Sequence, residues 1–283
     1  MNTKKLISLA AAALLVCSAA TAQTLKTPAP SSTQEFKQDF ALGQITVNYS
    51  RPSAKGRTVY GDLVPYGKIW RTGANAATKI TFTDKVKIEG KEVAAGTYAI
   101  YSVPNKDSWD VMIYNDLKLG GNVAEYKTEN EVARVTVKPT TTADKTETFT
   151  ININNVRSDS ANLELVWENT KVSVLITTEI DETIMKNIDN AMNVDSRPYF
   201  AAARYYYENN KDMKKALEWV NKAVDQNQQA FWIVLLKARI ELKLNDKKAA
   251  IASAEKTKKL ASEAKNDDYV KMADEVIKEA SAK

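Results

Sequence analysis

The stretch that decides the fold is residues 97–114, which read TYAIYSVPNKDSWDVMIY. Two runs rich in β-branched and aromatic residues flank a polar turn at residues 105–107, a pattern typical of antiparallel strands joined by a hairpin. Similar short runs occur on both sides of it, at residues 44–49, 79–83, 86–88, 133–138, 147–153, 162–167 and 171–178. Because no helical period interrupts residues 35–180, we expect an antiparallel, jelly-roll-like β-sandwich there.

Residues 60–79, YGDLVPYGKIWRTGANAATK, interrupt this alternation. Their three glycines and one proline break regular structure, whereas Tyr66 and Trp70 are too large and apolar for an ordinary solvated loop. We expect the segment to fold back onto a sheet and bury its aromatic rings, which would hold Arg71 and Asn75 in fixed positions. The same features suit a purely structural corner, in which the indole fills the core and the guanidinium binds loop carbonyls.

Five residues in or near this loop are candidates for ligand binding. They are Arg51, Tyr66, Trp70, Arg71 and Asn75. A guanidinium beside an indole, in a glycine-containing loop, can clamp a carboxylate or stack on a sugar ring. Arg51 precedes a proline at the end of a strand, from where its side chain can reach the same loop.

The N-terminus has the order of a secretory signal. Lys4 and Lys5 precede an apolar run at residues 6–16, and small residues follow. The pattern predicts a signal peptide over residues 1–22 and export to the periplasm or the medium. A lipid anchor on Cys17 is the alternative, but Val16 stands where such signals carry a small residue. Because the apolar run is short for a permanent span, we expect no transmembrane segment in the mature chain.

Composition excludes several kinds of chemistry. The sequence has no histidine, and its single cysteine lies within the predicted signal peptide. A Cys/His zinc site, a Ser-His-Asp triad and a Cys-His pair are therefore excluded from the mature chain. We expect no cofactor and no metal. Positive and negative charges alternate along the chain, which argues against a nucleic-acid partner.

The remaining segments are a leader and a helical tail. Residues 23–34 carry two prolines and a Ser-Ser-Thr run, which predict a flexible leader. Residues 181–283 take up a helical period, and from Pro198 onward we expect four or five helices. The sequence resembles itself at a spacing of 34 residues, so that Asp212 corresponds to Asp246. This period resembles that of the tetratricopeptide repeat. So few repeats predict packing against the sandwich or a partner, with Phe231 and Trp232 packed between repeats.

Three motifs carry a resemblance to a known family. They are RPSAKGR at residues 51–57, LVPYGKIWRTGANAAT at residues 63–78 and AGTYAIYSVP at residues 95–104. In this order they resemble the exported bacterial family Domain of Unknown Function 2911, over residues 38–180. The resemblance implies a β-domain, export and a helical tail, but no activity. Its signature implies the residues to test first: Arg51, Pro65, Tyr66, Gly67, Trp70, Arg71, Gly73, Asn75 and Thr78. Leu119 stands where the family pattern leads us to expect a tryptophan.

These observations favour a non-enzymatic, exported binding or scaffold protein. The loop at residues 60–79 would present its aromatic and arginine side chains, and the tail would dock a protein or glycan partner. One alternative is a glycan hydrolase that uses two carboxylates, drawn from Glu89, Asp110, Glu125 and Glu164. Another is a purely structural envelope protein whose tail assembles with others.

Overall fold

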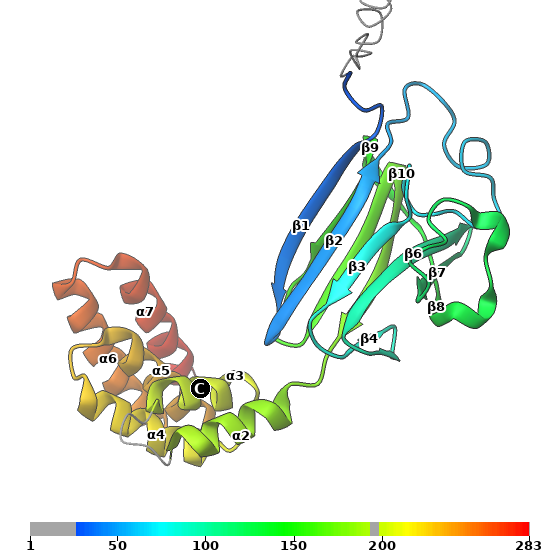
Figure 1. Ribbon diagram of the computed structural model, residues 1–283. Coiled ribbons are helices and arrows are strands. Elements are labelled where there is room, and N and C mark those ends of the chain that lie inside the picture. Colours follow the sequence, from blue (N-terminus) through cyan, green and yellow to red (C-terminus); the bar gives the residue numbers. More distant parts are fainter. Residues whose placement is uncertain (1–26, 193–197, 283) are drawn as a thin grey trace, which may run out of the picture. The chain divides into compact units, whose positions relative to one another are not determined.

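The computed structural model describes residues 27–192 and 198–282. The predicted signal peptide and Cys17 lie outside these ranges. The chain divides into two compact units, with the boundary between Glu179 and Ile180. The first is an antiparallel β-sandwich and the second is all α-helical, which confirms the predicted fold class (Figure 1).

Two antiparallel sheets form the sandwich. The six-stranded sheet has the order β1-β2-β3-β6-β7-β8 and the four-stranded sheet the order β5-β4-β10-β9. The strands are β1 Ser32–Phe40, β2 Gly43–Arg51, β3 Thr78–Phe82, β4 Val86–Ile88, β5 Lys91–Val93, β6 Gly96–Pro104, β7 Trp109–Tyr114, β8 Glu131–Val137, β9 Thr140–Asn154 and β10 Ser160–Thr177. Short turns join the pairs β1–β2, β4–β5, β6–β7 and β9–β10, as the hairpin spacing predicts, whereas longer segments join β2 to β3 and β7 to β8.

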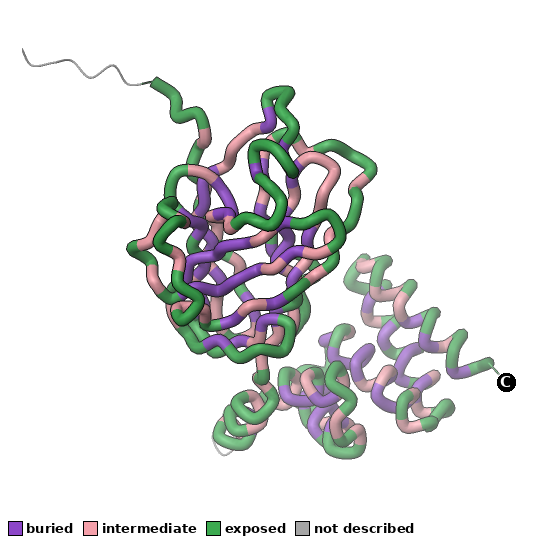
Figure 2. The backbone as a smooth tube through the Cα atoms, turned by 90° about the vertical axis from the view of Figure 1, so that its right-hand side faces the viewer, coloured by how far each residue is buried: buried purple, intermediate pink, exposed green. Residues whose placement is uncertain are grey.

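Alternation along each strand builds the core between the sheets. In β2 the residues Ile45, Val47 and Tyr49 are buried on one face, as predicted. From the facing sheet, β10 contributes Leu165 and Trp167 to the same cluster. Figure 2 shows the result as purple stretches inside the sandwich and green at the turns. Removing such side chains from water provides the main stabilising free energy of the unit.

Two strands differ from the sequence-based expectation. β1 begins at Ser32, inside the predicted leader, and pairs with β2 from Ser32 to Phe40. The expected strands at residues 162–167 and 171–178 form one long strand, β10, which continues through register shifts around Glu168. A bulge adds twist without ending the pairing, so a polar interruption in the sequence need not be a turn.

The six-stranded sheet also buries part of its outer face. Tyr101 on β6 and Tyr114 on β7 are fully buried there, in contact with Leu119 and Tyr126. These contacts come from residues 115–130, called here the cover segment, with the short helices η1 Val123–Glu125 and η2 Thr128–Asn130. Figure 1 draws the segment in green beside the strands it covers.

The helical unit consists of consecutive antiparallel helices. They are α2 Asp181–Met192, α3 Tyr199–Glu208, α4 Met213–Gln226, α5 Phe231–Lys243, α6 Lys247–Glu263 and α7 Asp267–Ser281. The carboxylates of Asp212 and Asp246 cap α4 and α6, so the 34-residue echo corresponds to equivalent helix starts. Pro198 is the N-cap residue of α3. None of the helices in the described residues is long and apolar enough to cross a membrane.

Candidate functional site

The loop at residues 60–79 is clamped to the six-stranded sheet through Trp70. Its backbone N–H donates to Ser102 O at 2.7 Å, and the Ser102 N–H donates back to Trp70 O at 2.9 Å. The indole Nε1–H donates to Gly73 O at 3.0 Å, which closes the tight bend that follows. Trp70 thus pairs with β6 as a residue of a neighbouring strand would, because both its backbone N–H and its carbonyl are hydrogen-bonded to Ser102.

The Trp70 ring belongs to the sandwich core. It is 9% exposed and stacks on Trp167 with ring centroids 6.0 Å apart. Phe149 and Trp109 lie edge-on to it at 5.0 and 6.3 Å. Trp70 therefore fills the core, as the structural-corner interpretation of the loop predicts. Its ring presents almost no surface to a ligand.

Arg71 lies where the loop meets the cover segment. A Cβ placed on Gly121 would be 3.5 Å from Arg71 Cδ and 2.8 Å from Asn75 O, so the two segments touch here. The side chain is partly buried, and its Nε has no hydrogen-bond partner among the described residues. No described acidic residue forms an ion pair with it. A partly desolvated guanidinium without an acceptor is suited to binding an anion.

Asn75 and Arg51 have structural partners. The Asn75 amide donates to Ser50 Oγ at 3.2 Å and to Ser31 O at 3.3 Å, which ties the loop to β2 and to the segment before β1. Arg51 donates from Nε to Phe149 O at 3.1 Å and from Nη2 to Thr150 Oγ1 at 2.7 Å. Arg51 therefore links β2 to β9 in the other sheet.

Tyr66 borders a cavity at one end of the sandwich, called here the sandwich-end pocket. Its volume is about 350 Å³ including the open mouth, and Tyr60, Asn105 and Thr170 also line it. Tyr66 is 38% exposed, and the adjacent Gly67 N–H is bound to Pro104 O at 2.9 Å. Of the predicted ligand residues, only Tyr66 lines this pocket, so the structure separates it from Arg71 and Asn75.

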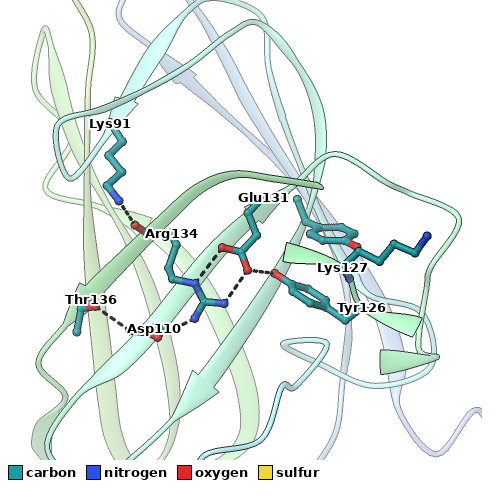
Figure 3. Close-up of polar contacts among 8 residues, drawn as sticks. Lys91, Asp110, Tyr126, Lys127, Glu131, Arg134 and Thr136 are labelled. Atoms are coloured by element: carbon teal, nitrogen blue, oxygen red, sulfur yellow. Dashed lines mark hydrogen bonds and ion pairs between the residues drawn. The ribbon is translucent and has the colours of Figure 1, made fainter. Parts of the chain in front are cut away.

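A polar network fixes the cover segment to the sheet (Figure 3). Arg134 on β8 binds Glu131 through two nitrogens, at 2.6 and 2.9 Å, and Asp110 through a third at 2.8 Å. The Tyr126 hydroxyl donates to Glu131 Oε1 at 2.9 Å, and Thr136 donates to Asp110 at 2.7 Å. The hydrogen bonds from Arg134 lower the pKa of Glu131, whereas burial raises that of Tyr126. Arg134 thus stabilises the ionised form of Glu131 and also forms an ion pair with Asp110.

The four acids considered for hydrolysis have separate surroundings. Asp110 belongs to the Arg134 network, and Glu164 is bound to Lys171 and to the Asn154 amide. Glu89 accepts from the Leu175 N–H at 2.6 Å, and Glu125 is exposed in η1. No group of three or more acidic, histidine or cysteine residues in the described chain is arranged to hold a metal ion.

The helical unit carries a groove that sequence analysis missed. Two cavities adjoin, since Tyr207, Arg239 and Met272 line both, and their volumes are about 680 and 720 Å³ including the open mouths. We define the helical groove by these residues together with Phe200, Arg204, Glu208, Trp232, Leu235, Leu236, Leu242, Lys243, Tyr269, Glu275, Val276 and Glu279. They come from α3, α5 and α7, which alternate with α4 and α6 along the chain. Trp232, expected to pack between repeats, is 40% exposed here.

Comparison with known proteins identifies the family of the chain. No curated protein and no solved structure matches the chain. The family model with the description "Protein of unknown function (DUF2911)" matches residues 31–176, which are just over half of the sequence. The match covers both sheets of the sandwich, including β1 and nearly all of β10. The chain therefore belongs to the DUF2911 family.

Proposed function

We propose that the chain is an exported, non-enzymatic binding or scaffold protein whose tetratricopeptide-like tail docks a segment of a partner protein. The helical groove is the observation that carries this proposal. Its walls combine Trp232, Met272 and Tyr207 with charged side chains, and it follows three helices rather than closing around a small molecule. Aromatic and arginine side chains dominate the free energy of binding at protein interfaces.

Arg239 indicates one feature of the docked segment. The side chain lines both cavities, is partly buried and has no ion-pair or hydrogen-bond partner in the described residues. The neighbouring Arg204 is different, because it is paired with Glu208 at 2.6 Å. An unpaired, partly desolvated guanidinium in a groove with both apolar and charged side chains favours a partner with apolar residues and one carboxylate.

Peptide selection tests this function. A phage-displayed random peptide library is selected against the chain from residue 23 onward, and the selected peptides are titrated by fluorescence anisotropy. We expect apolar sequences with an acidic residue, and a loss of affinity of about 30-fold with Trp232→Ala. Leu175→Ala, on an exposed sandwich position, is the matched control. Failure to select peptides, or equal affinity for Trp232→Ala, would contradict the proposal.

We propose a second binding function for the loop, on the basis of Arg71. Its unpaired Nε favours a carboxylate held in bidentate fashion, as on an acidic peptide or an acidic glycan. Panels of both are compared on the wild type, Arg71→Ala and Arg71→Lys. We expect binding to fall in both variants, since lysine lacks the planar fork. Arg57→Ala, which removes an arginine bound only to carbonyls of its own loop, should leave binding intact.

The two alternatives are separated by other measurements. A glycan hydrolase would release reducing ends from polysaccharides and lose that activity on substitution of a carboxylate pair. A purely structural envelope protein would assemble through its tail, and light scattering would then give a mass above that of one chain. The binding proposal predicts neither result in the absence of a partner.

A further inference from the structure

The sandwich-end pocket joins segments that are far apart in the sequence. The start of the loop, the β6–β7 turn, the β8–β9 connection and β10 each contribute to its wall. Hydroxyl, amide and aromatic groups dominate it: Tyr60, Tyr66, Asn105, Thr140, Thr141 and Thr170. Among its lining residues only Lys106 is charged. Such a wall is suited to a neutral ligand with many hydroxyl groups.

Tyr60 provides a hydroxyl that the fold leaves unused. Its ring lies edge-on to Trp109 and Trp167, with centroids 5.1 and 6.3 Å away. Burial raises the pKa of the phenol, so at neutral pH the group stays protonated and can both donate and accept. No described residue is its hydrogen-bond partner. The hydroxyl is therefore available to an occupant of the pocket.

Glu168 places a carboxylate close to this phenol. Its negative charge raises the pKa of Tyr60 further, after the effects of burial and of Tyr66. Glu168 Oε2 is 3.1 Å from Lys145 Nζ, but Oε1 is buried without a hydrogen-bond partner. The residue lies at a register shift with φ of 54°, a left-handed conformation that costs free energy. Glu168 is not among the residues that line the pocket, so its carboxylate acts on the site through the Tyr60 phenol rather than by contact with an occupant.

The Tyr66 ring is exposed but fixed. A Cβ on Gly61, whose φ is 96°, would lie 2.9 Å from the ring, so only glycine there lets the ring pack in this position. The next residue, Gly67, is held by the hydrogen bond from its backbone N–H to Pro104 O. A fixed ring at the pocket mouth offers a flat apolar surface beside hydroxyl and amide groups.

We propose that the sandwich-end pocket binds a neutral sugar ring, either free or at the end of an oligosaccharide. Tyr66 would pack against the apolar face of the sugar. The Tyr60 hydroxyl would exchange hydrogen bonds with a sugar hydroxyl. This site belongs to the β-sandwich and is separate from the helical groove, so peptide binding and sugar binding are tested independently.

Saturation-transfer difference NMR on the full chain tests the site. The probes are glucose, galactose, mannose and N-acetylglucosamine, each as the monosaccharide and at the end of a disaccharide. We expect at least one to bind with a dissociation constant in the millimolar range. Tighter binding of the disaccharide would identify a glycan end as the ligand, and equal binding a free sugar.

Two variants tie binding to the pocket. Tyr60→Phe keeps both ring contacts and removes only the hydroxyl, so affinity should fall about fivefold or more while the melting temperature is retained. Tyr66→Ala should abolish the signal. Thr97→Ala is the control and should not change it, because Thr97 is an exposed residue of β6 that lines a different cavity. The proposal is overturned if none of the sugars binds the wild type, or if both tyrosine variants bind as well as it does.

Discussion

Two tryptophans show how differently the two units treat the same side chain. Trp70, in a glycine-rich loop, is 9% exposed and packs among three aromatic rings, whereas Trp232, in a regular helix, is 40% exposed. The loop pairs with β6 through the backbone of Trp70, and the indole of that residue enters the core between the sheets. In the helix, Phe231 takes the packing position against Tyr269, and the next residue points about 100° away. Local sequence character therefore does not decide which aromatic residue is available to a partner.

The largest expected effect is that of Trp70→Ala. Removing an indole from between three rings leaves a cavity and should lower stability by about 3–5 kcal/mol. Trp232→Ala is the matched control and should change stability by less than about 0.5 kcal/mol. Thermal unfolding of both full-length variants, followed by near-UV circular dichroism, makes the comparison. A similar loss in both would mean that the indoles have the same role.

Gly121→Ala should have the next largest effect. The new methyl group would lie 2.8 Å from Asn75 O, so the cover segment or the loop must move, at a cost of about 1–3 kcal/mol. Gly56→Ala is the control, since nothing lies within 4 Å of its position and only its φ of 73° opposes alanine. If the Gly121 variant melts no lower than the Gly56 variant, the two segments are not in tight contact.

The helix caps test the repeat in the other unit. Asp212 accepts hydrogen bonds from the N–H groups of Lys214 and Lys215, and Asp246 accepts one from Ala249. Replacing either by alanine should cost about 1 kcal/mol. Equal losses in urea unfolding would confirm that the positions are equivalent. A loss confined to one of them would show that the 34-residue echo is not a structural repeat.

The smallest effect is a pH dependence of the sandwich. The pKa of Glu131 is lowered below its ordinary value of 4.5 by hydrogen bonds from Arg134. Its stabilising contribution is therefore fully present above pH 4.5 and is lost as the pH falls toward the folded-state value. Glu131→Gln should flatten the acid side of a stability profile. Asp181→Asn removes an exposed acid whose pKa is lowered by Lys211, and should change that profile less.

The fold was predictable because apolar and polar residues alternate in one strand after another. Alternation along β2 and β10 places apolar side chains on one face, and the helical period begins only near residue 181. β1 was missed because it is an edge strand whose exposed residues are polar, which leaves Phe36 and Phe40 as the only strong signal. The two strands expected at residues 162–167 and 171–178 form the single strand β10, since a bulge at Glu168 has the composition of a turn.

The candidate site was less predictable because it depends on contacts distant in the sequence. Nothing in the sequence around Arg71 indicates that Gly121 lies against it, or that Arg51 binds the opposite sheet. The sandwich-end pocket combines residues from Tyr60 to Thr170. The helical groove was missed for another reason. Its side chains recur on alternate helices, and helical spacing alone does not distinguish an exposed stripe from a buried one.

Hydrogen exchange of the full chain, with and without a selected peptide, tests the binding account most directly. We predict slower amide exchange in α3, α5 and α7 on peptide addition and no change in residues 60–79. Protection confined to the sandwich, or spread evenly over both units, would contradict the assignment of partner docking to the helical groove.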